Sequence, residues 1–134
     1  MNSGSSAAAK RSLIGDDEDA IVMLLKMRLE SAGYHTFSAF DGAGALKVVR
    51  ELEPDLVLLD VMMPPPNGFE VCRVIKNDSA LRKIPVILLT AKASETDQFW
   101  GSESGADAYI IKPYDPVELM NAIQKLISAE EKPL

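Results

Sequence analysis

Two short runs of the sequence, LVLLD at Leu56–Asp60 and VILLT at Val86–Thr90, are apolar at every position except the last. A strand with one face in solvent alternates apolar and polar side chains, whereas a strand in a parallel sheet covered on both faces is apolar throughout. The two runs therefore predict the buried centre of a parallel sheet. They also constrain the rest of the chain, because parallel strands need long crossover connections, which are usually helices.

Short β-rich runs and longer helical runs alternate along the sequence. The predicted strands are Arg11–Gly15, His35–Ala39, Leu56–Asp60, Pro85–Thr90 and Ala108–Ile111. The predicted helices are Asp19–Ala32, Gly42–Leu52, Gly68–Lys76, Glu95–Ser104 and Pro116–Ser128. Strict alternation with short connections predicts a doubly wound α/β fold, with helices on both faces of a five-stranded parallel sheet. Gly33 and Gly105 are expected just past the ends of the first and fourth helices.

Length and composition limit the remaining function classes. A chain of 134 residues fits one domain, which we expect at 10–129, with a disordered tail at 1–9 and a flexible C-terminus at 130–134. The net charge of −6 argues against direct nucleic acid binding, which needs clustered Lys and Arg. The one cysteine, Cys72, excludes an internal disulfide and favours a cytoplasmic location. No apolar run comes near the roughly 20 residues of a membrane span.

Polar side chains stand at the ends of four of the five predicted strands. Asp16 and Asp17 follow the first strand, Asp60 ends the third, Thr90 ends the fourth and Lys112 follows the fifth. The carboxyl ends of parallel strands meet at one edge of the sheet, where ligands bind in folds of this class. We therefore expect these side chains to converge on one crevice.

Three carboxylates at one place repel each other unless a cation joins them. Hard oxygen ligands of this kind suit Mg²⁺, which takes few protein ligands and keeps several waters. The alternative for each acid alone is ordinary, since an Asp at a strand end is commonly a turn residue or a helix N-cap. Asp17 is also a candidate cap for the first helix, Lys112 a candidate solvated loop lysine, and Thr90 a candidate strand-end hydroxyl bonded to backbone. The joint placement is what favours a metal site.

With these residues in place, the sequence resembles the receiver domain of bacterial two-component response regulators. The matching pieces are DDED (Asp16–Asp19), LVLLDVMMPPPNGFEV (Leu56–Val71), PVILLTAKAS (Pro85–Ser94) and GADAYIIKPY (Gly105–Tyr114). Together they cover nearly the whole chain after Lys10. The resemblance implies a flavodoxin-like sheet of order 2-1-3-4-5. It also implies a phosphorylation-switched signalling domain rather than an enzyme, one that assists only its own phosphorylation and dephosphorylation.

The resemblance assigns the acidic residues their roles. Asp60 is implied to be the phosphoacceptor. Asp17, Asp60 and the backbone carbonyl of Met62 are implied to bind Mg²⁺, with Asp16 acting through a metal-bound water. The phosphoryl donor is implied to be a sensor histidine kinase or a phosphotransfer protein.

The resemblance also assigns roles on the last two strands. The Thr90 hydroxyl is implied to donate to the phosphoryl group and Lys112 to pair with it. Tyr109 is the aromatic residue expected to swing inward when Thr90 moves. The Lys112–Pro113 peptide bond is expected to be cis.

Two surfaces are candidates for partner binding. Ile21, Leu24, Leu25 and Leu29 suffice for a core stripe on the first predicted helix. Val22 and Met23 lie off that stripe and are a candidate docking patch, although incidental exposure of apolar residues is common.

On the fourth predicted helix, Phe99 is expected by the resemblance to face the sheet. Trp100 is then exposed and marks a partner or self-association surface. Gly101, Ser102 and Ser104 weaken this helix, because none of them favours helical structure.

Two other functions remain as alternatives. An aspartyl-phosphate phosphatase of the haloacid-dehalogenase type carries a second Asp two residues past its nucleophile, and this chain has Met62 there. A flavin-binding flavodoxin-like module needs a phosphate loop rich in Ser, Thr and Gly after its first strand, where this chain has DDED.

Overall fold

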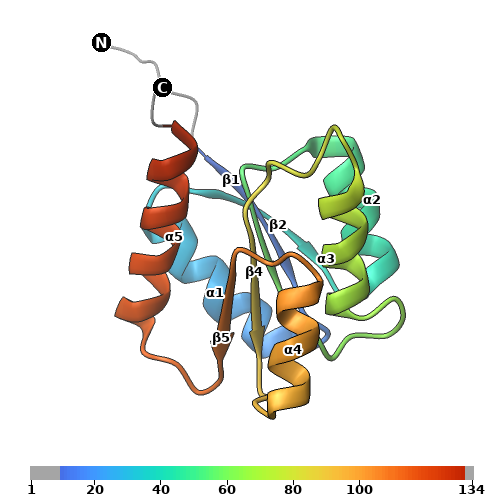
Figure 1. Ribbon diagram of the computed structural model, residues 1–134. Coiled ribbons are helices and arrows are strands. Elements are labelled where there is room, and N and C mark those ends of the chain that lie inside the picture. The colour runs from blue at the N-terminus through green and yellow to red at the C-terminus, as the bar shows by residue number, and fades with distance from the viewer. Residues whose placement is uncertain (1–9, 132–134) are drawn as a thin grey trace.

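The computed structural model describes residues 10–131, in which one parallel sheet of order β2-β1-β3-β4-β5 lies between two layers of helices (Figure 1). The strands are β1 (Arg11–Gly15), β2 (His35–Ala39), β3 (Leu56–Leu59), β4 (Val86–Thr90) and β5 (Ala108–Ile111). The helices are α1 (Asp19–Ser31), α2 (Gly42–Leu52), α3 (Gly68–Asn77), α4 (Glu95–Glu103) and α5 (Pro116–Glu131). The predicted fold class and strand order are confirmed. The tail expected at 1–9 and residues 132–134 lie outside the described residues.

β3 and β4 are buried on both faces because each face of the sheet meets a separate layer of helices. In β3, Val57 and Leu59 pack into the core shared with α2 and α3, whereas Leu56 and Leu58 pack into the core shared with α1 and α5. Figure 1 shows the same division, with α1 and α5 on one side of the sheet and α2 and α3 on the other. This is why these strands are continuously apolar.

Most element boundaries fall within one residue of the prediction. β4 begins at Val86 rather than Pro85, whose nitrogen has no hydrogen to donate to the ladder. The largest difference is at α5, which continues to Glu131, three residues past the predicted end at Ser128. Gly33 and Gly105 have φ angles of 94° and 85°, so both occupy the left-handed region expected after a helix.

The predicted core stripe of α1 is wrong at two positions. Val22 is buried, whereas Leu24 is 60% exposed. The observed stripe is Val22, Leu25 and Leu29. Consecutive apolar residues at the start of α1 fit more than one helical stripe, and packing on the sheet selects the one through Val22. Val22 is therefore a core residue and not part of a docking patch, while Met23 is exposed as expected.

The expected orientation of α4 is also wrong. Phe99 does not face the sheet: its side chain is 56% exposed, and Trp100 beside it is 45% exposed. The residue of α4 that is buried is Gly101, which lies against the ring of Tyr109. The ring fills the space in which an apolar side chain of the helix was expected.

α5 ends at the edge of the sheet where the strands begin. Ile127 lines a hollow together with Lys10, Asp55 and Pro85, which precede β1, β3 and β4. α5 therefore runs antiparallel to the strands and ends at the edge opposite their carboxyl ends. Among the described residues, no helix is both long and apolar enough to cross a membrane.

Candidate functional site

The sheet register places the predicted polar residues side by side at the carboxyl edge. Gly15 pairs with Leu59, and the Asp60 amide donates to the Gly15 carbonyl at 2.8 Å, so Asp16 and Asp60 leave neighbouring strands at the same level. On the other side of β3, the Lys112 amide donates to the Thr90 carbonyl at 2.8 Å. Parallel topology therefore brings these four residues to one place.

Lys112 lies between two buried carboxylates. Its Nζ is 2.7 Å from Oδ2 of Asp60 and 3.1 Å from Oδ2 of Asp16. Burial by itself lowers the pKa of Lys112, but its bonds to Asp60 and Asp16 outweigh that effect and the pKa is raised. Burial raises the pKa of Asp16, although the Glu18 amide and Lys112 oppose this. The site thus holds one ammonium group, whose protonated form is favoured, between two carboxylates.

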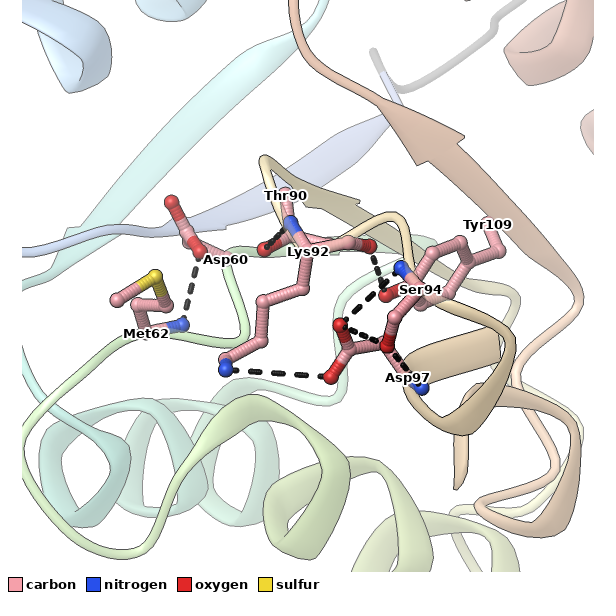
Figure 2. Close-up of polar contacts among 7 residues, drawn as sticks. All are labelled: Asp60, Met62, Thr90, Lys92, Ser94, Asp97 and Tyr109. Atoms are coloured by element: carbon pink, nitrogen blue, oxygen red, sulfur yellow. Dashed lines mark hydrogen bonds and ion pairs between the residues drawn. The ribbon is translucent and has the colours of Figure 1, made fainter. Parts of the chain in front are cut away.

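The Asp60 side chain is fixed by the backbone around it. Its Oδ1 accepts a hydrogen bond from the Met62 amide at 2.8 Å (Figure 2), while Oδ2 faces Lys112. A side chain on Gly68, the first residue of α3, would lie 2.5 Å from the Asp60 carbonyl oxygen, so α3 packs directly on the Asp60 backbone. Asp60 therefore has little freedom to move.

A hollow of about 300 Å³ gives access to Asp60 from solvent. Its lining residues are Asp17, Glu18, Asp60, Met62, Ala91 and Lys112. The Asp60 side chain is only 8% exposed, so a reacting group has to enter this hollow to reach it.

The residues around the hollow fit Mg²⁺. Asp17 is exposed, and its carboxylate forms no hydrogen bond or ion pair with the described residues. No three His, Cys, Asp or Glu side chains within the described part of the chain come together as a metal cluster. Mg²⁺ needs fewer, because it is commonly held by one or two carboxylates and completed by waters. Asp17 and Asp60 supply that number, and Asp16 is already held by Lys112.

Thr90 and Tyr109 meet through the backbone of one residue, Lys92. The Lys92 amide donates to Oγ1 of Thr90 at 3.2 Å, and the Tyr109 hydroxyl donates to the Lys92 carbonyl at 2.6 Å (Figure 2). Burial, with the charges of Asp97 and Asp60, raises the pKa of Tyr109, so its hydroxyl stays a donor. No side-chain pattern in the sequence indicates this bridge, because Lys92 makes it with backbone atoms.

The two predicted partner surfaces lie on α1 and α4. An apolar groove runs between α1 and the loop after β5, and its lining includes Leu24, Leu25, Pro113 and Tyr114. The Lys112–Pro113 peptide bond beside it is cis, as expected. On α4, Phe99 and Trp100 form an edge-to-face pair.

The geometry and the comparisons with known proteins agree on the class of protein. The family model of the response regulator receiver domain matches residues 13–124. The chain therefore belongs to the response regulator receiver domain family, whose members act in two-component signalling. It is a signalling domain, and the phosphatase alternative is not favoured.

Two curated relatives are regulators of about twice the length. The DNA-binding response regulator MtrA of Mycolicibacterium smegmatis is 43% identical over 122 residues, which are 91% of this chain and 52% of that protein. The alkaline phosphatase synthesis transcriptional regulatory protein PhoP of Bacillus subtilis is 40% identical over 122 residues, 91% of this chain and 50% of that protein. The chain thus spans about half the length of the curated relatives that it matches.

Solved structures of receiver domains match almost end to end. The signal receiver domain of a signal transduction histidine kinase from Syntrophus aciditrophicus has a TM-score of 0.88 and 36% identity, covering 94% of this chain and 96% of that one. A CheY-like response regulator receiver domain protein from Methanospirillum hungatei has a TM-score of 0.87 and 30% identity, covering 92% and 98%.

These relatives correct one expectation. The acidic composition predicted no direct nucleic acid binding, yet the relative MtrA is named a DNA-binding response regulator and PhoP a transcriptional regulatory protein. The prediction was wrong because it extended the charge of one domain to a whole regulator. The net charge of −6 describes only the half that this chain shares with those proteins.

Proposed function

We propose that this receiver domain accepts a phosphoryl group on Asp60 from a phosphohistidine or a small phosphodonor. The observation that carries the proposal is the ammonium of Lys112, 2.7 Å from the Asp60 carboxylate, at a hollow that opens to solvent. Asp17, Asp60 and the backbone carbonyl of Met62 would hold Mg²⁺, and Asp16 would act through a bound water. Bound Mg²⁺ supplies positive charge beside the phosphoryl oxygens.

The transfer needs positioning and charge more than acid–base catalysis. An oxygen of Asp60 forms a bond to phosphorus while the P–N bond of the phosphohistidine breaks, and the electron pair stays on the imidazole nitrogen. A carboxylate needs no general base to act as this nucleophile. Lys112 starts as the partner of Asp60 and can then pair with a phosphoryl oxygen in the same hollow.

Thr90 and Tyr109 would respond to a phosphoryl group on Asp60. Thr90 is fully buried, and its hydroxyl oxygen now accepts from the Lys92 amide. Movement of this hydroxyl toward a phosphoryl oxygen on Asp60 would draw the Lys92 amide with it, because that amide donates to the same oxygen. Because Tyr109 bonds to the carbonyl of the same residue, the movement would reach the β5 side of the domain.

The test is phosphorylation by phosphoramidate with Mg²⁺, followed by intact mass. Wild type should gain one phosphoryl group, Asp60→Asn none, and wild type in EDTA very little. Asp19→Asn is the matched control, because Asp19 is an exposed acid of the same DDED segment that lies outside the proposed site. A phosphoryl group retained by Asp60→Asn would refute the assignment.

The output that we infer from the relatives is control of DNA binding in a longer protein. Their names support this, as does the fact that this chain spans about half of each. The complete regulator should bind its DNA more tightly after phosphoramidate treatment. Equal binding by treated wild type and treated Asp60→Asn would contradict the inference.

A further inference from the structure

The buried residue of α4 is a glycine, Gly101. A Cβ built on it would lie 2.6 Å from Cδ2 and 2.8 Å from Cε2 of Tyr109. Carbon atoms in contact are ordinarily about 3.5–4.0 Å apart. The three atoms nearest to that Cβ all belong to Tyr109. No side chain fits at position 101 while the ring is in this place.

Three groups contact the side chain of Tyr109: Gly101 of α4, the ring of Phe69 on α3, and the Lys92 carbonyl. The two rings are stacked, with centroids 6.3 Å apart and planes 10° apart. The hydroxyl bond to Lys92 is 2.6 Å long. Lys92 also donates to Thr90, so the ring position is tied to the strand end beside Asp60 (Figure 2).

Gly101 is unfavourable for α4 itself. A glycine in a helix interior destabilises the helix relative to alanine. α4 is also the shortest helix among those that the structure describes, with 9 residues. The glycine therefore weakens a short helix at the point where it makes room for an aromatic ring.

We propose that Gly101 is a positioning residue for the switch: by leaving room for the Tyr109 ring, it allows the hydroxyl to bind the Lys92 carbonyl and so links α4 to Thr90. The proposal rests on the proposed function of the site. A methyl group at position 101 would displace the ring, since the ring turns about a side-chain torsion whereas α4 is held by its Ser94–Asp97 capping box. Phosphorylation would then still occur, but Tyr109 could not respond to it.

A double-mutant cycle tests the contact. The variants are Gly101→Ala, Tyr109→Ala and the double variant, and the measured quantity is the urea midpoint of unfolding. Gly101→Ala should lower the midpoint in wild type and raise it in the Tyr109→Ala background, where the methyl group has room and helix propensity decides. The matched control is Ser102→Ala, an exposed change on the same helix, which should raise the midpoint slightly in both backgrounds.

Equal shifts of the midpoint in both backgrounds would overturn the proposal, because Gly101 would then be only a weak helix residue. If Gly101→Ala does not fold, the double variant decides. Recovery of folding in the double variant supports the contact, and failure of both refutes it.

A spectroscopic measurement separates positioning from a structural role. In protein labelled with 3-fluorotyrosine, the Tyr109 ¹⁹F resonance is assigned by its loss in Tyr109→Phe. Wild type and Ser102→Ala should show a change of this resonance on treatment with phosphoramidate and Mg²⁺. Gly101→Ala should start at a different shift and show no such change, while intact mass reports phosphorylation within about twofold of wild type. The same resonance and the same change in Gly101→Ala would refute the inference.

The two proposals fail in different ways. If wild type takes up no phosphoryl group, the proposed function fails, and the midpoint cycle still decides whether Gly101 places Tyr109. If wild type is phosphorylated and Gly101→Ala responds normally, only the inference fails.

Discussion

At the scale of single residues, Lys112 sets the charge balance of the site. It binds Asp16 and Asp60 together, so one positive charge faces two buried negative ones. The sequence suggested three acids that repel one another. The structure instead divides them into two that share Lys112 and one, Asp17, that stays exposed and without a partner among the described residues. On the proposed function, the exposed acid is the one that would meet an incoming cation.

Removing one buried charge should therefore stabilise the domain in the absence of metal. Burial raises the pKa of Asp16, which means that its charged form is less favourable in the folded domain than in water. Asp16→Asn keeps the acceptor for the Glu18 amide. In EDTA we expect it to raise the free energy of unfolding by about 0.5–2 kcal/mol, as measured by urea unfolding.

The opposite change is the control. Lys112→Met leaves both carboxylates buried without a counter-charge, and we expect a loss of about 2 kcal/mol. If Asp16→Asn and Lys112→Met both destabilise the domain in EDTA, the shared-charge account of the site is wrong.

Met62 should govern how long a phosphoryl group stays on Asp60. Its side chain is 56% exposed and lines the hollow through which water has to reach the acyl phosphate. Met62→Asn replaces an apolar obstacle with a smaller polar group that can hold a water. Loss of phosphate after removal of the donor, followed by intact mass, should be faster in this variant than in wild type. An unchanged or longer lifetime would contradict the prediction.

At the scale of elements, α4 depends on its N-terminal cap. The Ser94 hydroxyl accepts from the Asp97 amide at 3.0 Å, and Asp97 reaches back to the Ser94 amide and hydroxyl (Figure 2). Ser94→Ala should lower the free energy of unfolding by about 1 kcal/mol. Since α4 is short, the amides of α4 should exchange with deuterium faster in this variant. Faster exchange of α3 and α4 alike would mean that the cap supports the whole layer instead.

The elements themselves could be predicted because several signals agree. Continuous apolar runs mark β3 and β4, and Gly or Pro residues punctuate the chain near the element ends, so the strands were placed to within one residue. The faces of helices were harder. In α1 several apolar residues follow one another and leave the stripe undetermined, and in α4 the buried position is a glycine, which has no apolar side chain to signal it.

The site could be predicted as far as topology determines it. Parallel pairing in this strand order brings Asp16, Asp60, Thr90 and Lys112 to one edge. How far the Lys112 side chain reaches, and that Tyr109 bonds to a backbone carbonyl, depend on side-chain torsions and main-chain positions. No spacing of residue types encodes either of these.

At the scale of the whole molecule, metal binding and folding should be linked. Asp17 and Asp60 come from the ends of different strands and meet only in the folded domain, so Mg²⁺ should bind the folded state preferentially. The gain in stability is about 2.7 kcal/mol when the free metal is 100 times its dissociation constant. Melting curves with increasing Mg²⁺ should shift upward for wild type and for Asp19→Asn. They should shift little for Asp17→Asn, and an equal shift in all three would exclude this metal site.

The direction of α5 decides where another protein can be joined. Ile127 lies beside Lys10 and Asp55, so α5 ends at the edge of the sheet opposite Asp60. A strand of five residues spans roughly 17 Å, so a polypeptide attached beyond α5 starts about one strand length from the acceptor. A fluorescent protein fused there would leave the hollow at Asp60 open to a kinase. The junction lies farther from Asp60 than the screening length of about 8 Å at physiological salt, so such a fusion would report phosphorylation through a change of conformation and not through the added charge.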